Sequence, residues 1–165
     1  MKKKFLRKSL LALAGILTFS ISFISQAATN VELHGPTQPV APGSEFDLTV
    51  VLNSSTSINP GYYSFQITFD KTMFELVSVK YGNHTEFVRP TASVSSYYNY
   101  LYITDTNKNY GGTCQSVTTK NFAYIKLRVK KEAPLGVSSN FNFVVYRTYP
   151  VFKYCNGQDI TGEVY

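Results

Sequence analysis

Polar and apolar positions alternate most strictly between residues 61 and 70. Aromatic or aliphatic side chains take every second position, namely Tyr63, Phe65, Ile67 and Phe69. The positions between them hold Tyr62, Ser64, Gln66, Thr68 and Asp70. A period of two places successive side chains on opposite faces of a β-strand. The pattern therefore predicts a strand with one face in a core and the other open to solvent or to a ligand.

Similar patterns predict further strands along the chain. We expect them at 30–34, 45–53, 74–79, 85–89, 95–105, 121–131, 140–146 and 160–165, and a loop rich in serine, proline and glycine at 54–61. After residue 27 no segment longer than a couple of turns has helical spacing. About nine short strands at these intervals predict an all-β fold, an antiparallel β-sandwich of jelly-roll or immunoglobulin-like type.

The segment 121–131 alternates nearly as strictly as the first. The predicted inward side chains are Ala123, Ile125, Leu127 and Val129. The predicted outward side chains are Phe122, Tyr124, Lys126, Arg128 and Lys130. This division places the aliphatic side chains in the core and most of the long polar ones in solvent.

The first 27 residues have the organisation of an export signal. Five basic residues precede an apolar stretch from Leu10 to Ile24, and the small residues Ser25 and Ala27 follow on either side of Gln26. The pattern predicts a signal peptide over residues 1–27, cleaved after Ala27, and one mature domain over residues 28–165. The expected location is secreted, outside a bacterial cell. A membrane anchor is the alternative, but the apolar stretch is shorter than the ~20 residues of a membrane span. After cleavage of the signal no membrane association is expected.

The net charge of the chain comes from this signal. The whole sequence has 16 Lys and Arg against 10 Asp and Glu, which gives +6. Five of the basic residues and none of the acidic ones lie in the signal, so residues 28–165 have 11 against 10, or +1. A nearly neutral domain lacks the basic surface that binds nucleic acid, and we expect no nucleic-acid partner.

Cys114 and Cys155 are the two cysteines of the chain. In an exported protein an even pair predicts a disulfide. The bond would close a loop of about 40 residues and stabilise the fold by roughly 3–4 kcal/mol if it acts by restricting the unfolded chain.

Tyrosines gather at residues 97–102. If Leu101 and Ile103 face the core, Tyr98, Tyr100 and Tyr102 form an outward row with about 7 Å between successive rings. Such rings stack on sugar rings or anchor a protein interface. The alternative is that they cover the sheet and pair only with neighbouring strands.

Asp105, Asn107 and Asn109 have the spacing of the first three ligands of a calcium loop. The sixth position of such a loop is Tyr110 here instead of glycine, and the twelfth is Ser116 instead of glutamate. An ordinary polar loop is therefore the favoured interpretation, and calcium is the weaker alternative. No other metal or cofactor is expected.

The sequence contains no recognisable active site. Neither His34 nor His84 accompanies a nucleophile motif. The acidic residues occur as solvated groups on strands and turns and not as the paired carboxylates of a glycosidase cleft. We therefore expect a protein that is not an enzyme.

Several segments carry a resemblance to a known family when they are taken in order. They are 42–50 (PGSEFDLTV), 61–82 (GYYSFQITFDKTMFELVSVKYG), 101–105 (LYITD) and 121–136 (NFAYIKLRVKKEAPLG). These segments resemble strands of cohesins, the secreted β-sandwich modules that bind dockerins in cellulosome-type assemblies. The resemblance covers nearly the whole chain after the signal, from about Val31 to Val164.

The resemblance implies a non-catalytic binding module. Cohesins of the first type often carry Asn and Asp on the outward face of the third strand, where dockerin contacts fall, and the matching positions here are Tyr62 and Ser64. We expect one outward sheet face to hold the partner site, formed by Tyr62, Ser64, Gln66, Thr68, Tyr98, Tyr100, Tyr102, Lys126 and Arg128. The expected partner is a dockerin-like protein in a polysaccharide-degrading or surface assembly. Direct glycan binding is the alternative, since cohesins share their fold with carbohydrate-binding modules.

Overall fold

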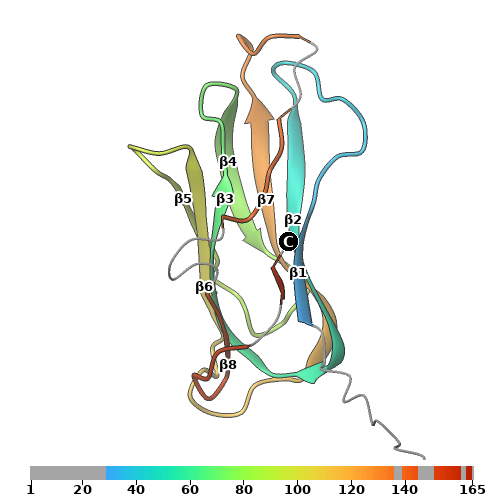
Figure 1. Ribbon diagram of the computed structural model, residues 1–165, viewed down its shortest axis with the longest axis vertical. Helices are drawn as coiled ribbons and strands as arrows, with labels where there is room; N and C mark the ends of the chain where they lie inside the picture. Colours follow the sequence, from blue (N-terminus) through green and yellow to red (C-terminus); the bar gives the residue numbers. More distant parts are fainter. Residues whose placement is uncertain (1–28, 136–138, 145–150, 161–162, 165) are drawn as a thin grey trace, which may run out of the picture.

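The protein is a sandwich of two β-sheets that lie face to face (Figure 1). The structure, a computed structural model, describes residues 29–135, 139–144, 151–160 and 163–164. These residues form the strands β1 (Thr29–His34), β2 (Glu45–Ile58), β3 (Pro60–Thr68), β4 (Phe74–Tyr81), β5 (Thr91–Val94), β6 (Tyr100–Thr106), β7 (Val117–Val129), β8 (Val151–Tyr154) and β9 (Glu163–Val164). The five-stranded sheet has the order β4-β7-β2-β1-β9, and the four-stranded sheet has the order β5-β6-β3-β8.

Neighbouring strands are antiparallel in both sheets, except that β1 and β9 are parallel. The described residues contain no helix, and so none that is long and apolar enough to cross a membrane. The predicted all-β sandwich of jelly-roll type is confirmed. The predicted signal peptide over residues 1–27 lies outside the described residues.

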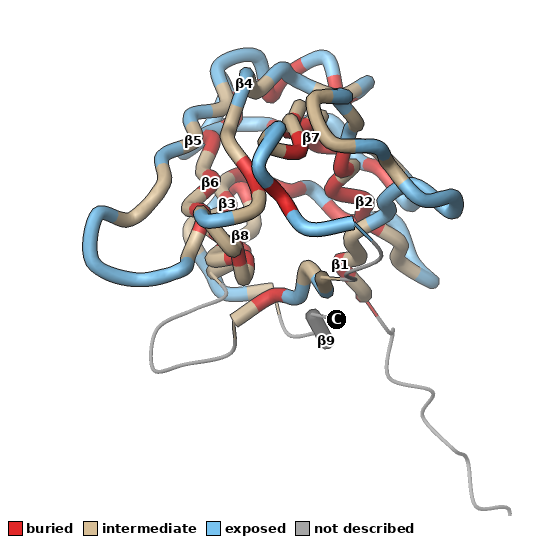
Figure 2. Tube along the Cα trace, turned by 90° about the horizontal axis from the view of Figure 1, so that it is seen from above, coloured by how far each residue is buried: buried red, intermediate tan, exposed pale blue. Residues whose placement is uncertain are grey.

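The core lies between the two sheets and contains many aromatic rings. In Figure 2 the buried parts of the chain lie in the middle of the molecule and the exposed ones mostly in the connections around it. Tyr63, Phe65 and Ile67 of β3 are fully buried, while the residues between them are half-buried, which confirms the predicted alternation. The rings of Tyr63 and Phe65 stack with centroids 5.2 Å apart, and Phe122 of β7 lies 5.4 Å from Tyr63. Burial of such large rings supplies much of the hydrophobic stabilisation.

In strand β7 the predicted inward side chains are confirmed, but one side chain predicted to point outward lies in the core. Ala123 and Phe122 are both fully buried, although adjacent residues of a regular strand face opposite ways. The register explains this, because Val50 of β2 pairs with Ala123 while Val51 pairs with Asn121. Phe122 is thus the extra residue of a β-bulge, and the bulge turns its ring into the core.

Strand β2 is longer than predicted, and the loop expected at 54–61 does not form. The strand continues to Ile58, which is buried and pairs with Val117 of β7 after a register shift. Asn59 alone separates β2 from β3, although the two strands belong to different sheets. Residues 55–57 are polar because they are exposed on the strand, not because the chain turns there.

The strand predicted over 95–105 is a hairpin loop followed by a shorter strand. Strand β5 ends at Val94, residues 95–99 form the turn, and β6 begins at Tyr100. The amide of Ser95 donates to the carbonyl of Tyr100 at 2.9 Å, and the amide of Tyr98 donates to Oγ of Ser95 at 3.0 Å. The serine hydroxyl thus stabilises a turn inside a segment whose composition is typical of a strand.

The remaining predicted strands differ in extent from the observed ones. Residues 85–89 contain a turn instead of a strand. In the segment 140–146 the described residues form only a bridge between Phe143 and Ile67 beside β3. Strand β8, which the sequence did not suggest, pairs with the first half of β3 on the same side. Strand β9 falls inside the predicted segment 160–165.

Candidate partner-binding surface

The outward side of the four-stranded sheet brings together most of the predicted binding residues. Burial alternates along β3 and β6, and their register pairs Tyr100 with Thr68, Tyr102 with Gln66 and Thr104 with Ser64. We call this surface the tyrosine face. It consists of Tyr62, Ser64, Gln66 and Thr68 of β3, Tyr100, Tyr102, Thr104 and Thr106 of β6, Thr91 and Ser93 of β5, and Val151 and Lys153 of β8.

Tyr98 lies beside the tyrosine face, in the β5–β6 turn. Its ring stacks on that of Tyr100 with centroids 5.9 Å apart and planes 25° apart. Tyr97 and Tyr98 are 89% and 63% exposed, so both rings are open to a ligand. The ammonium group of Lys71 donates to the carbonyls of Ser95 and Ser96 at 3.4 and 2.9 Å and fixes the turn. This turn projects at the upper left of Figure 1.

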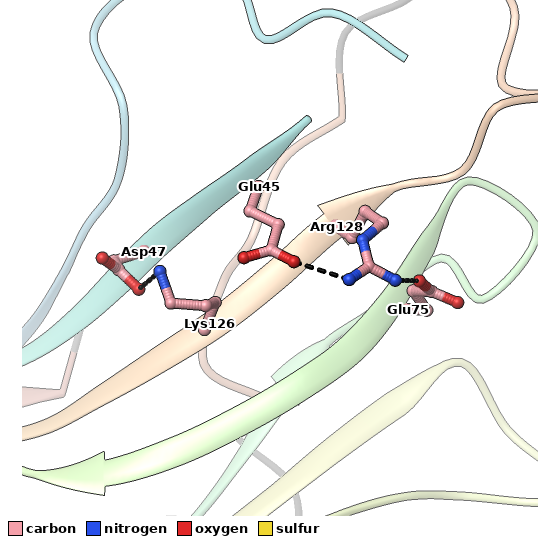
Figure 3. Close-up of polar contacts among 5 residues, drawn as sticks. All are labelled: Glu45, Asp47, Glu75, Lys126 and Arg128. Carbon is pink, nitrogen blue, oxygen red and sulfur yellow. Dashed lines mark hydrogen bonds and ion pairs between the residues drawn. The ribbon is translucent and has the colours of Figure 1, made fainter. Parts of the chain in front are cut away.

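Lys126 and Arg128 do not lie on the tyrosine face. They project from β7 in the five-stranded sheet, on the opposite side of the sandwich (Figure 3). The single binding face predicted for all nine residues is therefore wrong in this respect. The prediction fails because alternation within a strand shows which side chains point outward but not which of the two sheets contains the strand.

Both basic residues are held by acidic partners on the neighbouring strands β2 and β4 (Figure 3). Lys126 Nζ lies 3.2 Å from Asp47 Oδ1. Arg128 Nη2 lies 2.6 Å from Glu45 Oε1, and Arg128 Nη1 donates to Glu75 Oε1. These hydrogen bonds, the one to Glu45 first, raise the pKa of Arg128. We call this surface the ion-pair face, because both of its central basic side chains are paired with acidic ones.

The side chains of residues 105–109, which have calcium-like spacing, make hydrogen bonds within the protein. Asn107 is buried, and its Nδ2 donates to Glu86 Oε2 at 2.9 Å. Asn109 Nδ2 donates to Glu86 Oε1 at 2.5 Å. The carboxylate of Asp105 accepts the amides of Thr106 and Arg89. The two asparagines thus offer amide donors to Glu86, and calcium stays the weaker alternative for this loop.

The pKa values of the two carboxyl groups near this loop are shifted in opposite directions. Burial raises the pKa of Asp105, and the two amide donors only partly offset it. Burial also acts to raise the pKa of Glu86, but hydrogen bonds from Asn107, the Gln115 amide and Asn109, together with the nearby His84, leave it below its usual value. Glu86 is therefore a charged group that holds the β6–β7 connection in place.

The predicted disulfide between Cys114 and Cys155 is confirmed, with Cα atoms 5.8 Å apart. It ties the β6–β7 connection to the end of β8, the edge strand of the four-stranded sheet. The amide of Gly111 also donates to the carbonyl of Cys155 at 2.9 Å. One border of the tyrosine face is thus fixed covalently.

The rest of the described chain contains a further hollow and two histidines. A cavity of about 820 Å³ lies between the β1–β2 connection and residues 133–135 and 139–142, and none of the predicted binding residues lines it. His34 pairs with Glu32 on the surface, while His84 is buried between Phe87 and Phe122. The described residues contain no group of three or more His, Cys, Asp or Glu side chains placed to hold a metal.

Comparison with protein families decides the relationship. A model of the cohesin domain family matches residues 29–159, which is most of the chain. The chain belongs to the cohesin family. Cohesin domains are non-catalytic protein-binding modules, which agrees with the prediction that the protein is not an enzyme.

Solved cohesin structures share the fold at low sequence identity. A type II cohesin from Bacteroides cellulosolvens has a TM-score of 0.64 at 15% identity, covering 82% of this chain and 95% of its own. The sixth cohesin of scaffoldin B from Acetivibrio cellulolyticus, in complex with a double mutant of the Cel5 dockerin, has a TM-score of 0.63 at 17% identity, covering 84% of this chain and 94% of its own. A non-cellulosomal cohesin from the archaeon Archaeoglobus fulgidus has a TM-score of 0.60 at 13% identity, covering 84% of this chain and 86% of its own. No curated protein sequence matches the chain.

Several residues of the tyrosine face were missed by sequence analysis. Thr91 and Ser93 belong to β5, and Val151 and Lys153 belong to β8, neither of which was predicted as a strand. Thr104 and Thr106 were within reach of the pattern, because they continue the alternation of Tyr100 and Tyr102 along β6. The exposed Tyr97 was part of the tyrosine cluster but not of its predicted outward row.

Proposed function

We propose that this cohesin is a secreted module that binds a dockerin-type protein through its tyrosine face. Solved cohesins with the same fold form complexes with dockerins, among them cohesins from Acetivibrio cellulolyticus and Clostridium thermocellum. The module would serve an extracellular assembly that degrades polysaccharide or is attached to the cell surface.

The contrast between the two outer faces of the sandwich is the observation that carries the proposal. On the ion-pair face, Arg128 is held by Glu45 and Glu75, and Lys126 by Asp47. A partner that docks there must desolvate these charges and compete with existing ion pairs. On the tyrosine face, the side chains of Ser64 and Gln66 have no hydrogen-bond partner among the described residues and lie beside partly exposed tyrosine rings. Free polar groups next to aromatic rings are typical of a protein interface.

Secretion is supported by two independent features. The first 27 residues have the organisation of a signal peptide. The disulfide between Cys114 and Cys155 needs an oxidising environment such as the cell exterior. Expression of the full chain in a bacterial host, followed by mass spectrometry of the exported product, should give an N-terminus at Ala28.

The proposed interface is tested by binding of residues 28–165, in oxidised form, to immobilised dockerins. The probes are the Cel5 dockerin and the dockerins in the complexes with the Clostridium thermocellum and Clostridium acetobutylicum cohesins. Tyr100→Ala is expected to weaken binding at least about tenfold, as for an aromatic anchor of an interface. Tyr81→Ala is the matched control, because Tyr81 is 59% exposed on β4 of the other sheet. An equal loss of dockerin affinity in both variants, or a loss only in the control, would contradict the proposed binding face.

Direct glycan binding is the second candidate function. The neighbouring rings of Tyr98 and Tyr100 and the exposed ring of Tyr97 are the observation that favours it. Exposed aromatic rings offer open faces on which sugar rings stack. Retention on insoluble cellulose or xylan that is lost in Tyr98→Ala, without binding to any dockerin probe, would establish the glycan in place of the protein partner.

A further inference from the structure

The tyrosine face is almost free of charge, whereas the charges of the strands lie on the opposite face. Lys153 is the one charged side chain among the described residues assigned to the tyrosine face. Its Nζ lies 3.0 Å from Asp159 Oδ1, so this charge already has a partner. The ion-pair face, in contrast, gathers Glu45, Asp47, Glu75, Lys126 and Arg128 around three strands (Figure 3).

The tyrosine face offers neutral polar groups, and two of them, on Ser64 and Gln66, are unused among the described residues. No side-chain hydrogen bond of Ser64 or Gln66 forms within the described residues. Hydroxyl and amide groups both donate and accept hydrogen bonds, and they pair well with other neutral polar groups. Thr104 differs, because its hydroxyl already donates to the carbonyl of Tyr63 at 2.8 Å. Ser64 and Gln66, in the middle of β3, thus have polar groups available to a partner.

Among the described residues of this surface, Lys153 is the one possible counter-charge, and it is already paired with Asp159. Moving an ion out of water onto a neutral face costs desolvation that no ion pair repays. A neutral polar group loses less solvation and regains its hydrogen bonds from Ser64 or Gln66, and an apolar group gains contact with the rings of Tyr98 and Tyr100. The composition of the face therefore selects against charge in whatever docks on it.

We infer that the protein partner covers the tyrosine face with an uncharged surface of aliphatic and Ser, Thr, Asn or Gln side chains. This inference rests on the proposed function and adds the chemistry of the partner's contact surface. Because no charge pairs form across such an interface, the association is insensitive to salt. A positive or a negative charge introduced at the centre of the tyrosine face should therefore weaken the association.

Two measurements test the inference on residues 28–165 with the dockerin probes named above. The first is isothermal titration calorimetry of the unmodified domain at 50 and 500 mM NaCl, where we expect the Kd to change by less than about twofold. The second compares Ser64→Asp with Ser64→Lys, and we expect each to raise the Kd at least about tenfold. The controls are Ser78→Asp and Ser78→Lys, because Ser78 is equally half-buried on β4 of the other sheet. These controls should leave the Kd unchanged.

The outcomes separate this inference from the proposed function. If one Ser64 variant weakens binding while the variant of opposite charge strengthens it, the partner surface is charged and the inference is wrong. A rise of the Kd by about tenfold or more between the two salt concentrations also shows a charged partner surface, without any variant. If no dockerin probe binds the unmodified domain, the proposed function fails and the inference fails with it.

Discussion

Replacing Glu86 by glutamine is expected to destabilise the protein through the connection between β6 and β7. Glu86 is only 9% exposed, and its carboxylate accepts three hydrogen bonds. The donors are Asn107 Nδ2 at 2.9 Å, the amide of Gln115 at 2.6 Å and Asn109 Nδ2 at 2.5 Å. Glutamine has nearly the same shape but has one acceptor oxygen and one NH₂ group. At least one of the three donors therefore loses its acceptor.

The cost follows from which oxygen is kept. The variant loses the fewest hydrogen bonds if the glutamine oxygen takes the place of Glu86 Oε2, which accepts from Asn107 and Gln115. Only Asn109 then faces an NH₂ group. A lost hydrogen bond to a buried charged group costs about 2 kcal/mol, and two bonds that change from charged to neutral lose about 0.5 kcal/mol each. We therefore expect the free energy of unfolding to fall by about 3 kcal/mol.

Urea unfolding followed by circular dichroism at pH 7 measures this loss. Glu132→Gln is the matched control, because Glu132 is exposed and should change the free energy by less than about 0.5 kcal/mol. The pKa of Glu86 lies below its usual value, so its contribution is complete above the ordinary glutamate pKa of about 4.3 and is lost as the pH falls through the folded pKa. The difference between the unmodified protein and Glu86→Gln should thus shrink as the pH falls from about 5 to 3. A difference below about 1 kcal/mol at pH 7, or one that grows on acidification, would refute the reasoning.

Two further predictions concern the disulfide and the contact between Gly82 and β7. Replacing Cys114 and Cys155 together by serine removes a cross-link between residues 41 apart. We expect the free energy of unfolding, measured in a urea titration, to fall by about 4 kcal/mol. Dithiothreitol should cause the same loss in the unmodified protein and leave the stability of the variant unchanged. Gly82→Ala places a methyl group 1.9 Å from the carbonyl oxygen of Asn121, a backbone atom that cannot move aside locally. We therefore expect thermal unfolding to show a free energy of unfolding lower by at least about 3 kcal/mol. Stability close to that of the unmodified protein would show that the strands can separate there.

The parts of the fold that the sequence predicted well are those decided by local periodicity or by residue counts. Phe65 and Ile67 of β3 alternate with polar residues because one side of the strand is core and the other is surface. The disulfide followed from there being two cysteines in a chain whose first 27 residues have the pattern of an export signal. Neither inference needs knowledge of which strands become neighbours.

The parts that sequence did not predict depend on contacts between distant segments. Phe122 faces inward because β2 and β7 change register beside it, which only the paired strands reveal. The turn before Tyr100 depends on Ser95 and on Lys71, which lies on another connection. Lys126 is outward, as its pattern indicates, but the order of strands places it on the far sheet.

The most direct test of the account is nuclear magnetic resonance of the ¹⁵N-labelled domain, residues 28–165, titrated with a dockerin that binds it. The account predicts that the largest chemical-shift changes fall on the tyrosine face, at Ser64, Gln66 and Tyr100, while Lys126 and Arg128 stay at their free positions. Large changes at Lys126 and Arg128, with Ser64 and Gln66 unchanged, would contradict it.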